Sequence, residues 1–453
     1  MSVEQFFSDS VLLARSTFGT TMAFHIIFAT LGVSLPLMIL ISEIMYQRTK
    51  DPDYALMANR WIKGQAILLG VAIPSGTIAG VQLSLLWPGF MEIVGKVVAL
   101  PFQIEIFAFF LEALFLSIYV YAADRLSPMM RIVSVFFVLL GATASAVLIT
   151  SVHSFTGTPA GFALQEGEVV NVDPWAAFFN PGFYTNAAHV VASAYMTGAF
   201  IIVSIAAYKM LKTDGPQSRE YRFHQKALMM GLIVGGIFSL ATAWNGHGAA
   251  QMLHQYQPEK LAAAEGLFET QDYAPLTIGG ITDPDEEAVR FGIEIPWALS
   301  FLAGDRFDEV VVGLNEFPKE HWPPLYIHVL FNAMVGIGML LIFIGFVGFG
   351  WKILYRKSPF SRKVKWLFVT TGPLAMIGIE FGWIFSCTGR QPWVIYHTML
   401  TSEAATRTAG LGPLFALFAL VYVILGVITA LVFKYYFGRK PLKKELMKQT
   451  IES

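Results

Sequence analysis

Nine long apolar stretches are the feature that most constrains this 453-residue chain. Each is near the ~20 residues that an α-helix needs to cross the hydrocarbon core of a bilayer. They lie at residues 18–46, 64–86, 101–122, 131–152, 187–208, 227–244, 324–351, 366–387 and 410–433. Charged residues make up 14% of the chain, against roughly 25% in an average globular domain. We therefore predict an all-α, polytopic membrane protein in which residues 1–453 form a single integral membrane domain.

The positions of Lys and Arg predict the orientation of these stretches, because cytoplasmic loops are enriched in both residue types. All but eight of the 31 Lys and Arg residues follow an odd-numbered stretch. The eight exceptions are Arg15, Lys96, Lys260, Arg290, Arg306, Lys319, Arg390 and Arg407. We expect the N-terminus outside and the C-terminus in the cytoplasm. The acidic first residues have no basic region or small-residue cleavage site, so we expect no cleaved signal peptide.

One connection, residues 245–322, is far longer than the ~12–15 residues usual for a loop without structure of its own. It lies on the expected outer side and contains a short helical pattern at 257–265, so we predict a functional extracytoplasmic loop. Lys260 and Glu265 lie in that pattern, five residues apart, and so do not share a helix face. They either grip two sides of a small polar head group or belong to a solvated surface.

Candidate metal ligands gather in the outer half of the predicted membrane domain. They are His25, His153, His189, His328, Met334 and Cys387. A His–Met pair on facing helices suits a six-coordinate haem that transfers electrons, whereas a single ligand leaves one side of the iron open. Taken alone, a histidine in a span is about as often a packing residue, and a methionine is usually core filler. Because all six lie in the same half of the membrane, we favour binding of iron porphyrins over scattered packing roles. The single cysteine excludes an internal disulfide and a cysteine-held iron–sulfur cluster.

Two further places carry charge inside apolar sequence. Glu105 and Glu112 are about two helical turns apart and share a face. Such carboxylates usually line a proton path, and the alternative is an ion pair that only joins helices. The stretch ending at residue 387 carries Glu380 and Trp383, and its helix ends at the sequence Gly-Arg-Gln-Pro-Trp, residues 389–393. Arg390 at this depth needs an anionic partner, such as a haem propionate or a carboxylate.

Together these residues resemble subunit I of the cytochrome bd quinol oxidases, of the type with a short quinol loop. The resemblance covers nearly the whole chain. It rests on residues 14–25, 105–112, 124–126, 189–198, 257–265, 295–299, 334–335 and 389–393. It implies a multi-pass protein of the prokaryotic cell membrane that oxidises quinol at the outer face and reduces dioxygen to water. Charge separation would come without a proton pump.

The resemblance also implies cofactors, roles and partners. The cofactors are a low-spin haem b, a high-spin haem b, and a haem d or third haem b. His189 and Met334 would ligate the low-spin haem, and His25 one high-spin haem. The other implied sites are Lys260 and Glu265 for quinol, Glu105 and Glu112 for protons, Trp383 between haems, and Arg390 at propionates. The implied partners are cytochrome bd subunit II and, as an option, a small single-helix subunit. No feature of the sequence indicates that nucleic acid is a partner.

Four positions depart from the family pattern. Cys387 stands where a glutamate usually ligates the second high-spin haem, so a thiolate, His153, His328, Glu380 or no side chain would serve there. Cys387 as a small apolar residue is the plain alternative. Asn332 replaces a common arginine, and His247 a common acidic residue, while His153 replaces a common asparagine. The departures place the chain in a divergent branch.

Two other functions are compatible with this sequence. One is that of a related redox protein that carries only b-type haems or reduces an acceptor other than oxygen. Cys387 is the observation that suggests this alternative. The other is a proton-coupled transporter that uses Glu105, Glu112 and the outer loop. The sequence does not show the paired, interrupted spans of an inverted repeat, which weakens the case for a transporter.

Overall fold

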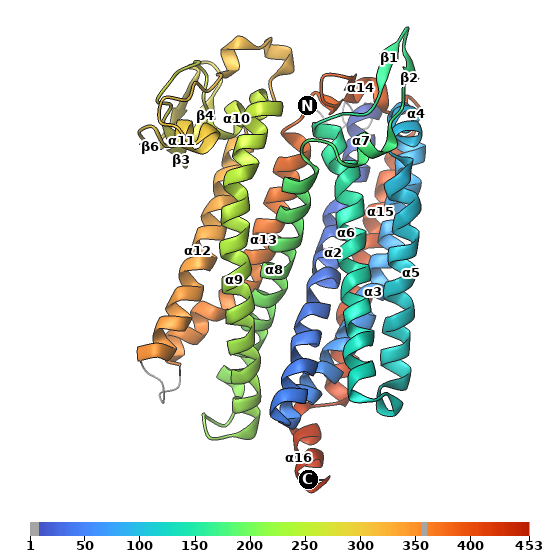
Figure 1. Ribbon diagram of the computed structural model, residues 1–453, viewed down its shortest axis with the longest axis vertical. Helices are drawn as coiled ribbons and strands as arrows, with labels where there is room; N and C mark the ends of the chain where they lie inside the picture. Colours follow the sequence, from blue (N-terminus) through green and yellow to red (C-terminus); the bar gives the residue numbers. More distant parts are fainter. Residues whose placement is uncertain (1–8, 355–359, 453) are drawn as a thin grey trace.

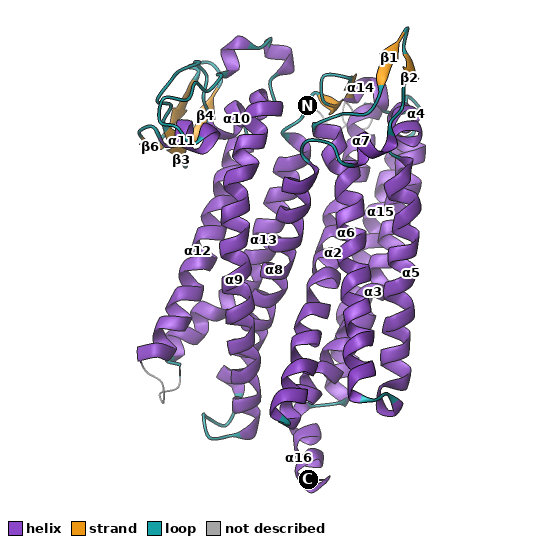
Figure 2. Cartoon of the chain, viewed as in Figure 1, coloured by secondary structure: helices purple, strands orange, loops and turns teal. Residues whose placement is uncertain are grey.

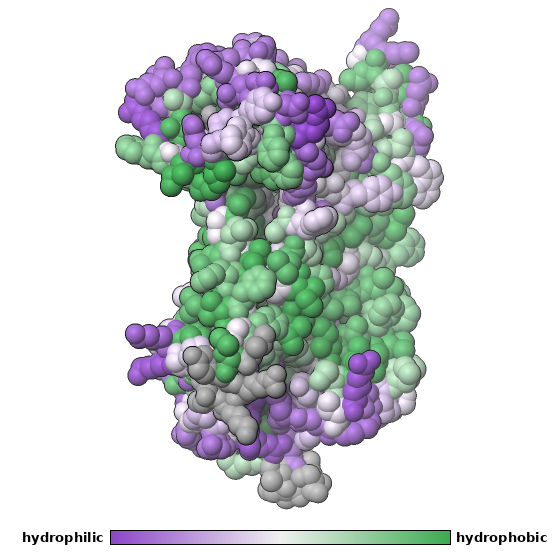
Figure 3. All heavy atoms as spheres, turned by 60° about the vertical axis from the view of Figure 1, so that its left-hand side comes forward, coloured by the Kyte–Doolittle hydropathy of each residue, from purple (hydrophilic) through white to green (hydrophobic). Residues whose placement is uncertain are grey.

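A computed structural model describes residues 9–354 and 360–452. Within these residues, nine helices are long and apolar enough to cross a membrane, and they stand side by side (Figure 1). On the face that Figure 3 shows, apolar side chains cover the middle of the molecule, between polar bands at its two ends. The expectation of an all-α, polytopic fold is confirmed.

The long helices contain the expected apolar stretches almost completely. They are α2 (Ser10–Thr49), α3 (Pro52–Leu86), α5 (Ala99–Ala122), α6 (Pro128–Gly157), α8 (Phe183–Lys212), α9 (Arg219–Tyr256), α12 (Ile327–Leu354), α13 (Arg362–Thr388) and α15 (Leu411–Arg439). Several begin at a serine N-cap, whose hydroxyl accepts a hydrogen bond from a free backbone N–H of the first turn. Ser127, Ser218 and Ser361 do this for α6, α9 and α13.

The helices pack in two groups, which Figure 1 shows side by side. Helices α2, α3, α5, α6 and α15 form the first bundle, and α8, α9, α12 and α13 form the second bundle. Helices α2 and α6 also pack against α8 and so join the bundles. Close approach depends on glycine: a Cβ on Gly141 of α6 would lie 2.7 Å from the Ala108 carbonyl oxygen of α5.

Short elements cover one end of the bundles, which we call the loop end (Figure 2). Its helical elements are α4 (Pro88–Val97), α7 (Pro174–Phe178), α10 (Pro258–Glu265), α11 (Ala298–Gly304), η2 (Leu314–Glu316), η3 (Lys319–His321) and α14 (Thr401–Ala404). Its strands form antiparallel pairs: β1 (Ala163–Gln165) with β2 (Glu168–Val170), β3 (Leu276–Ile278) with β6 (Ile293–Ile295), β4 (Ile281–Asp283) with β5 (Ala288–Arg290), and β7 (Trp393–Ile395) with β8 (Met399–Leu400).

Two expected boundaries were wrong. The loop was expected to begin at residue 245, but α9 continues to Tyr256, because the chain has no helix breaker before Pro258. Gly246 and Gly248 are tolerated in α9, and the space beside each is open. The seventh span was expected roughly from residue 324, but α12 begins at Ile327, after a turn in which the Ile327 N–H donates to the carbonyl oxygen of Pro324.

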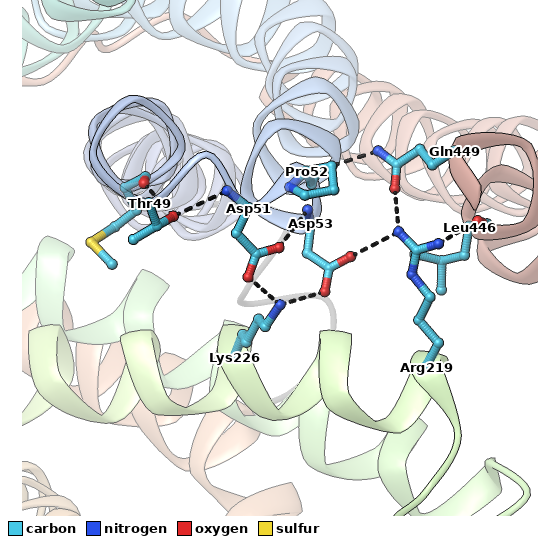
Figure 4. A network of polar contacts seen from close by, with 9 residues as sticks. Thr49, Asp51, Pro52, Asp53, Arg219, Lys226, Leu446 and Gln449 are labelled. Carbon is cyan, nitrogen blue, oxygen red and sulfur yellow. Dashed lines mark hydrogen bonds and ion pairs between the residues drawn. The ribbon is translucent and has the colours of Figure 1, made fainter. Parts of the chain in front are cut away.

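The opposite end, which we call the tail end, carries η1 (Ala123–Arg125) and α16 (Leu442–Glu452). A polar network fastens the α2–α3 turn to α9 and α16 there (Figure 4). Lys226 of α9 bonds Asp51 and lies 2.6 Å from Asp53. Arg219 lies 3.4 Å from the same Asp53 and donates to the carbonyl oxygen of Leu446 in α16.

Candidate functional site

His189 lies in the second turn of α8, near the loop end of the second bundle. Its Nδ1 atom is 3.0 Å from Oδ1 of Asn245 on the neighbouring helix α9. An amide oxygen only accepts, so Nδ1 carries the proton and Nε2 presents its lone pair. Within the described residues, no protein group bonds Nε2. Metal-binding histidines commonly have this arrangement, in which a second residue fixes the tautomer and the ring orientation.

Met334 lies two turns into α12, in the same bundle as His189. Its sulfur atom is 3.0 Å from the point that a Cβ on Gly382 of α13 would occupy. Any larger residue at position 382 would therefore displace the thioether. Farther along α12, the space beside Gly336 and Gly338 is open. The second bundle thus combines a free imidazole nitrogen, a thioether and residues without side-chain bulk.

His25 lies in α2 and therefore in the first bundle, separate from His189 and Met334. Its Nδ1 atom is 2.9 Å from Oγ of Ser75 on α3, and Ser75 in turn donates to the carbonyl oxygens of Val71 and Ala72. The imidazole is held at one edge, and no described group bonds Nε2. Gly76 makes room for the ring, because a Cβ there would lie 3.0 Å from Cε1 of His25.

The two bundles meet at His153 of α6 and the last turns of α13. Nε2 of His153 is 2.8 Å from Oγ of Ser386, and the His153 ring stands edge-on to Trp383 with centroids 5.2 Å apart. Arg390 donates to the carbonyl oxygen of His153 at 3.2 Å. Trp383 and Arg390 therefore lie at the contact between bundles.

Three groups in or just after α13, Glu380, Cys387 and Arg390, bear on an anionic or iron-bound partner. The Nε atom of Arg390 and the Oε1 atom of Glu380 are buried, and neither has a hydrogen-bond partner in the described part of the chain. Cys387 is exposed. A buried arginine nitrogen without a partner fits the expected haem propionate, since buried polar groups are normally paired.

Helix α10 carries Lys260 and Glu265, and both side chains are buried, with residue exposures of 5% and 3%. The Nζ atom of Lys260 donates to the carbonyl oxygen of Ser386 at 3.1 Å and lies 4.8 Å from the centre of the Phe385 ring. Burial, and then the positive charge of Arg390, lower the pKa of Lys260 to about 7. The alternative of a solvated Lys–Glu surface is not supported, because α10 is packed inward against α9 and α12.

Glu265 at the end of α10 has no partner for its Oε2 atom in the described chain. Burial raises the pKa of its carboxyl group to about 8. At neutral pH the side chain is therefore a neutral acid that can both donate and accept a hydrogen bond. Its orphaned oxygen leaves a polar position open for a hydroxyl or carbonyl group of a ligand.

Glu105 and Glu112 lie in α5, and both accept from neutral groups. Glu112 accepts from Nε2 of Gln65 at 3.1 Å, and Glu105 accepts from the Ser145 hydroxyl at 2.9 Å. Neither carboxylate forms an ion pair with a described residue, so the alternative of a structural ion pair is not supported. The hydrogen bonds connect α5 to α3 and to α6.

Sequence reasoning missed the hydrogen-bond partners of several loop-end residues. His328 is fully buried, and its two ring nitrogens lie 2.7 Å and 2.8 Å from the carbonyl oxygens of Ala264 and Gly279. Both nitrogens are therefore engaged, and His328 does not fit the role of substitute iron ligand. A second missed set is Glu259 with Tyr396 and His397. Pairing across 138 residues leaves no local pattern that could have revealed it.

Among the described residues, no three His, Cys, Asp or Glu side chains are close enough to hold a metal ion by themselves. The ligand candidates instead occur singly, or as His189 with Met334 in one bundle. That donor set suits iron that is already held by a porphyrin. The fold and these sites define a membrane-embedded haem protein that carries electrons.

Comparison with known proteins identifies the family. Residues 13–441 match the sequence profile of cytochrome bd terminal oxidase subunit I, and the chain belongs to this family. It is 65% identical over 438 residues to a Bacillus subtilis protein named as a candidate cytochrome bd menaquinol oxidase subunit I, with 97% of this chain and 99% of the relative covered. It is 30% identical to the cytochrome bd ubiquinol oxidase subunit 1 of Bacillus subtilis, with 94% and 93% covered.

A solved structure agrees. The bd oxidase of Geobacillus thermodenitrificans matches with a TM-score of 0.90 and 43% identity, covering 96% of this chain and 100% of the other. The chain is therefore a subunit of a quinol:oxygen oxidoreductase of prokaryotic respiration, embedded in the cell membrane by several spans. The family implies haem cofactors and a quinol substrate, as the sequence resemblance had indicated.

Proposed function

We propose that His189 and Met334 would hold the iron of a low-spin haem b in the second bundle. The hydrogen bond from His189 to Asn245 is the observation that carries this assignment, because it leaves Nε2 free and aligns the ring. Gly382 supports it by leaving room for the Met334 sulfur. The bound haem would supply one-electron transfer, while the protein fixes its ligands and excludes water.

His25 would hold one high-spin haem in the first bundle, with Ser75 as its orienting partner. A second high-spin haem, a haem d or a third haem b, would lie toward the contact of the bundles, near Trp383. Its protein ligand would be Glu380 or Cys387. The buried, unpartnered oxygen of Glu380 favours the carboxylate, whereas the thiol of Cys387 is exposed. Arg390 would pair with a propionate.

Quinol would bind beside α10, between Lys260 and the orphaned Glu265 carboxyl. This assignment requires the loop end to face the outside, which the low number of Lys and Arg residues there supports. The segment between α9 and α12, residues 257–326, would then be an extracytoplasmic quinol-binding loop. Glu105 and Glu112 would carry protons between hydrogen-bonded groups of the first bundle.

The subunit would work in a complex with cytochrome bd subunit II, and a small single-helix subunit is a further candidate partner. A relative with only b-type haems is the second candidate function, and the cysteine at position 387 is the observation that favours it. Family membership favours an oxidase over a proton-coupled transporter.

The test uses the purified oxidase complex, with haems extracted and identified and with oxidised and reduced spectra recorded. In His189→Ala the low-spin signal should disappear, while the high-spin signals of the first bundle remain. Equal loss of all haem signals would contradict separate sites. A chlorin among the extracted haems would exclude the form with only b-type haems. The quinol site is tested separately, since Lys260→Ala should raise the KM for quinol.

A further inference from the structure

Glu259 is a second buried acid of α10, next in sequence to Lys260. It is 2% exposed, and both of its oxygens are engaged. The Tyr396 hydroxyl donates to Oε2, and Nε2 of His397 lies 2.8 Å from Oε1. Lys260 instead contacts the end of α13, so the two neighbouring residues point to different surroundings. Helix α10 therefore connects the proposed quinol site to a separate acid–imidazole pair.

His397 connects this buried acid to solvent. Its ring stacks on Tyr396 with centroids 4.2 Å apart and meets Trp393 edge-on at 5.3 Å. Its side chain is nevertheless 53% exposed, whereas that of Glu259 is 3% exposed. The backbone of His397 has φ of 50°, in the left-handed region that non-glycine residues seldom adopt. Such backbone strain persists only when the surrounding structure maintains it.

A hollow of about 400 Å³ lies on the exposed side of this pair. Its lining includes Tyr396, His397 and Tyr256. His397 carries the only imidazole among the lining residues. Water in the hollow would therefore reach one ring edge of His397, while the other edge faces Glu259.

If Glu259 only fastened α10 to residues 393–400, hydrogen bonds from the Tyr396 hydroxyl and from any neutral donor would be sufficient. An imidazole that joins a buried carboxylate to water can also pass a proton, because it accepts at one nitrogen and releases at the other. The other titratable groups around the pair are Tyr256 and Tyr396, with His321 beyond Trp393 and Lys260 following Glu259 in the chain.

We propose that Glu259 and His397 form the proton-release pair for quinol oxidation at the loop end, and this rests on the proposed quinol site beside α10. Quinol loses two electrons and two protons as its two O–H bonds break and two C=O bonds form. The electrons go to dioxygen in the established reaction. Each proton would reach the Glu259 carboxyl group, and the protonated acid would donate to Nε2 of His397 as the Nδ1 proton leaves to water. Exchange of the Nε2 proton for one on Nδ1 through water would return the ring to its starting tautomer before the second proton follows.

The test compares two electron donors in the purified oxidase complex. Quinol releases protons on oxidation, whereas tetramethylphenylenediamine gives up one electron and no proton. In Glu259→Gln and His397→Gln, we expect quinol-driven oxygen uptake to fall about 10²-fold in kcat. Uptake driven by the amine should stay within about twofold. His321→Gln is the matched control, because His321 contacts Trp393 without reaching Glu259.

Chemical rescue separates proton transfer from structure. Because the His397 side chain is half exposed, added imidazole should restore quinol turnover in His397→Ala, in proportion to the neutral imidazole concentration. Equal losses with both donors and no rescue would overturn the proposal in favour of a structural tie. Unchanged quinol kcat in both Gln variants would also overturn it. If Lys260→Ala leaves the KM for quinol unchanged, the quinol site itself is wrong, which is a distinguishable result.

Discussion

Nδ1 of His328 lies 2.7 Å from the carbonyl oxygen of Ala264, the residue before Glu265. On the same helix α12, Asn332 accepts a hydrogen bond from the Gly279 N–H, and Nε2 of His328 faces the Gly279 carbonyl oxygen. Two residues one turn apart thus hold both the end of α10 and the β3–β4 turn.

Replacing His328 should loosen the quinol site. In His328→Ala the buried carbonyl oxygens of Ala264 and Gly279 lose their partner, at about 1–3 kcal/mol for each unsatisfied group. We expect the KM for quinol to rise about tenfold and amide hydrogen exchange in residues 257–282 to increase, with haem content unchanged. Unaltered exchange in that segment would count against this role for the histidine.

Gly382→Ala should disturb the Met334 ligand. The added Cβ would lie 3.0 Å from the sulfur, which must give way by a few tenths of an ångström. The low-spin component of the reduced spectrum should therefore weaken or shift. The protein should stay folded, because alanine favours the helix by ~1 kcal/mol. Gly338→Ala in α12 is the matched control, since nothing lies within 4 Å of a Cβ there. A normal low-spin spectrum in Gly382→Ala would argue that Met334 is not a ligand.

Asn245 should determine how firmly the low-spin haem is held. Asn245→Leu removes the acceptor for Nδ1 of His189, and loss of such a partner typically weakens metal binding 10–100-fold. Asn245→Asp keeps an acceptor and adds negative charge, which should lower the reduction potential while retaining haem. Haem occupancy during dilution in detergent and a redox titration measure these effects. Equal occupancy in wild type and Asn245→Leu would contradict the ligand assignment.

Glu265 should make quinol affinity depend on pH. Because burial raises its folded pKa to about 8, the carboxyl is protonated at neutral pH and ionises only above that value. Ionisation in the unfolded chain begins near the ordinary pKa of ~4.3, so folded stability falls as pH rises between the two values and is constant beyond. Glu265→Gln should remove this loss and keep the neutral-pH KM within about threefold.

The measurements for Glu265 are KM and the thermal unfolding midpoint from pH 6 to pH 9. Wild-type KM should change through pH 8, while that of Glu265→Gln stays flat. The midpoint of the variant should exceed that of wild type most at the alkaline end. Parallel pH profiles for the two proteins would show that another group titrates.

The tail-end network should contribute to stability. Asp53 receives both Lys226 and Arg219, and its side chain is 7% exposed. Asp53→Asn should destabilise by ~1–2 kcal/mol, less than for a fully buried pair because both partners are partly exposed. Asp214→Asn is the control, since the Asp214 side chain is 84% exposed and its 3.4 Å pair with Lys443 should matter little. Similar unfolding midpoints for the two variants would contradict a larger contribution of Asp53 than of Asp214 to stability.

The crossings could be predicted from the sequence, because hydropathy is a property of each segment alone. The same holds for α10, which begins at Pro258 and ends where Gly266 adopts a φ of 70°. Residues 257–265 and 389–393 also indicated the family, since both motifs are short and contiguous. Helix ends were less certain: α9 continues to Tyr256 although residues 245–248 are poor helix formers, so packing of α10 and α11 against α9, not local propensity, accounts for the extension.

Partners between distant segments came only from the tertiary structure. No pattern in the sequence shows that His328 has both nitrogens engaged, that Lys260 and Glu265 are buried, or that Glu259 meets His397. Whether a histidine is free to bind iron depends on which helix supplies the group at its other nitrogen, as Asn245 does for His189. The amino-acid order determined how many times the chain crosses and which ligand types it carries. Packing between helices decided which of those side chains face a cofactor, because hydrogen-bond partners depend on distances that sequence separation does not measure.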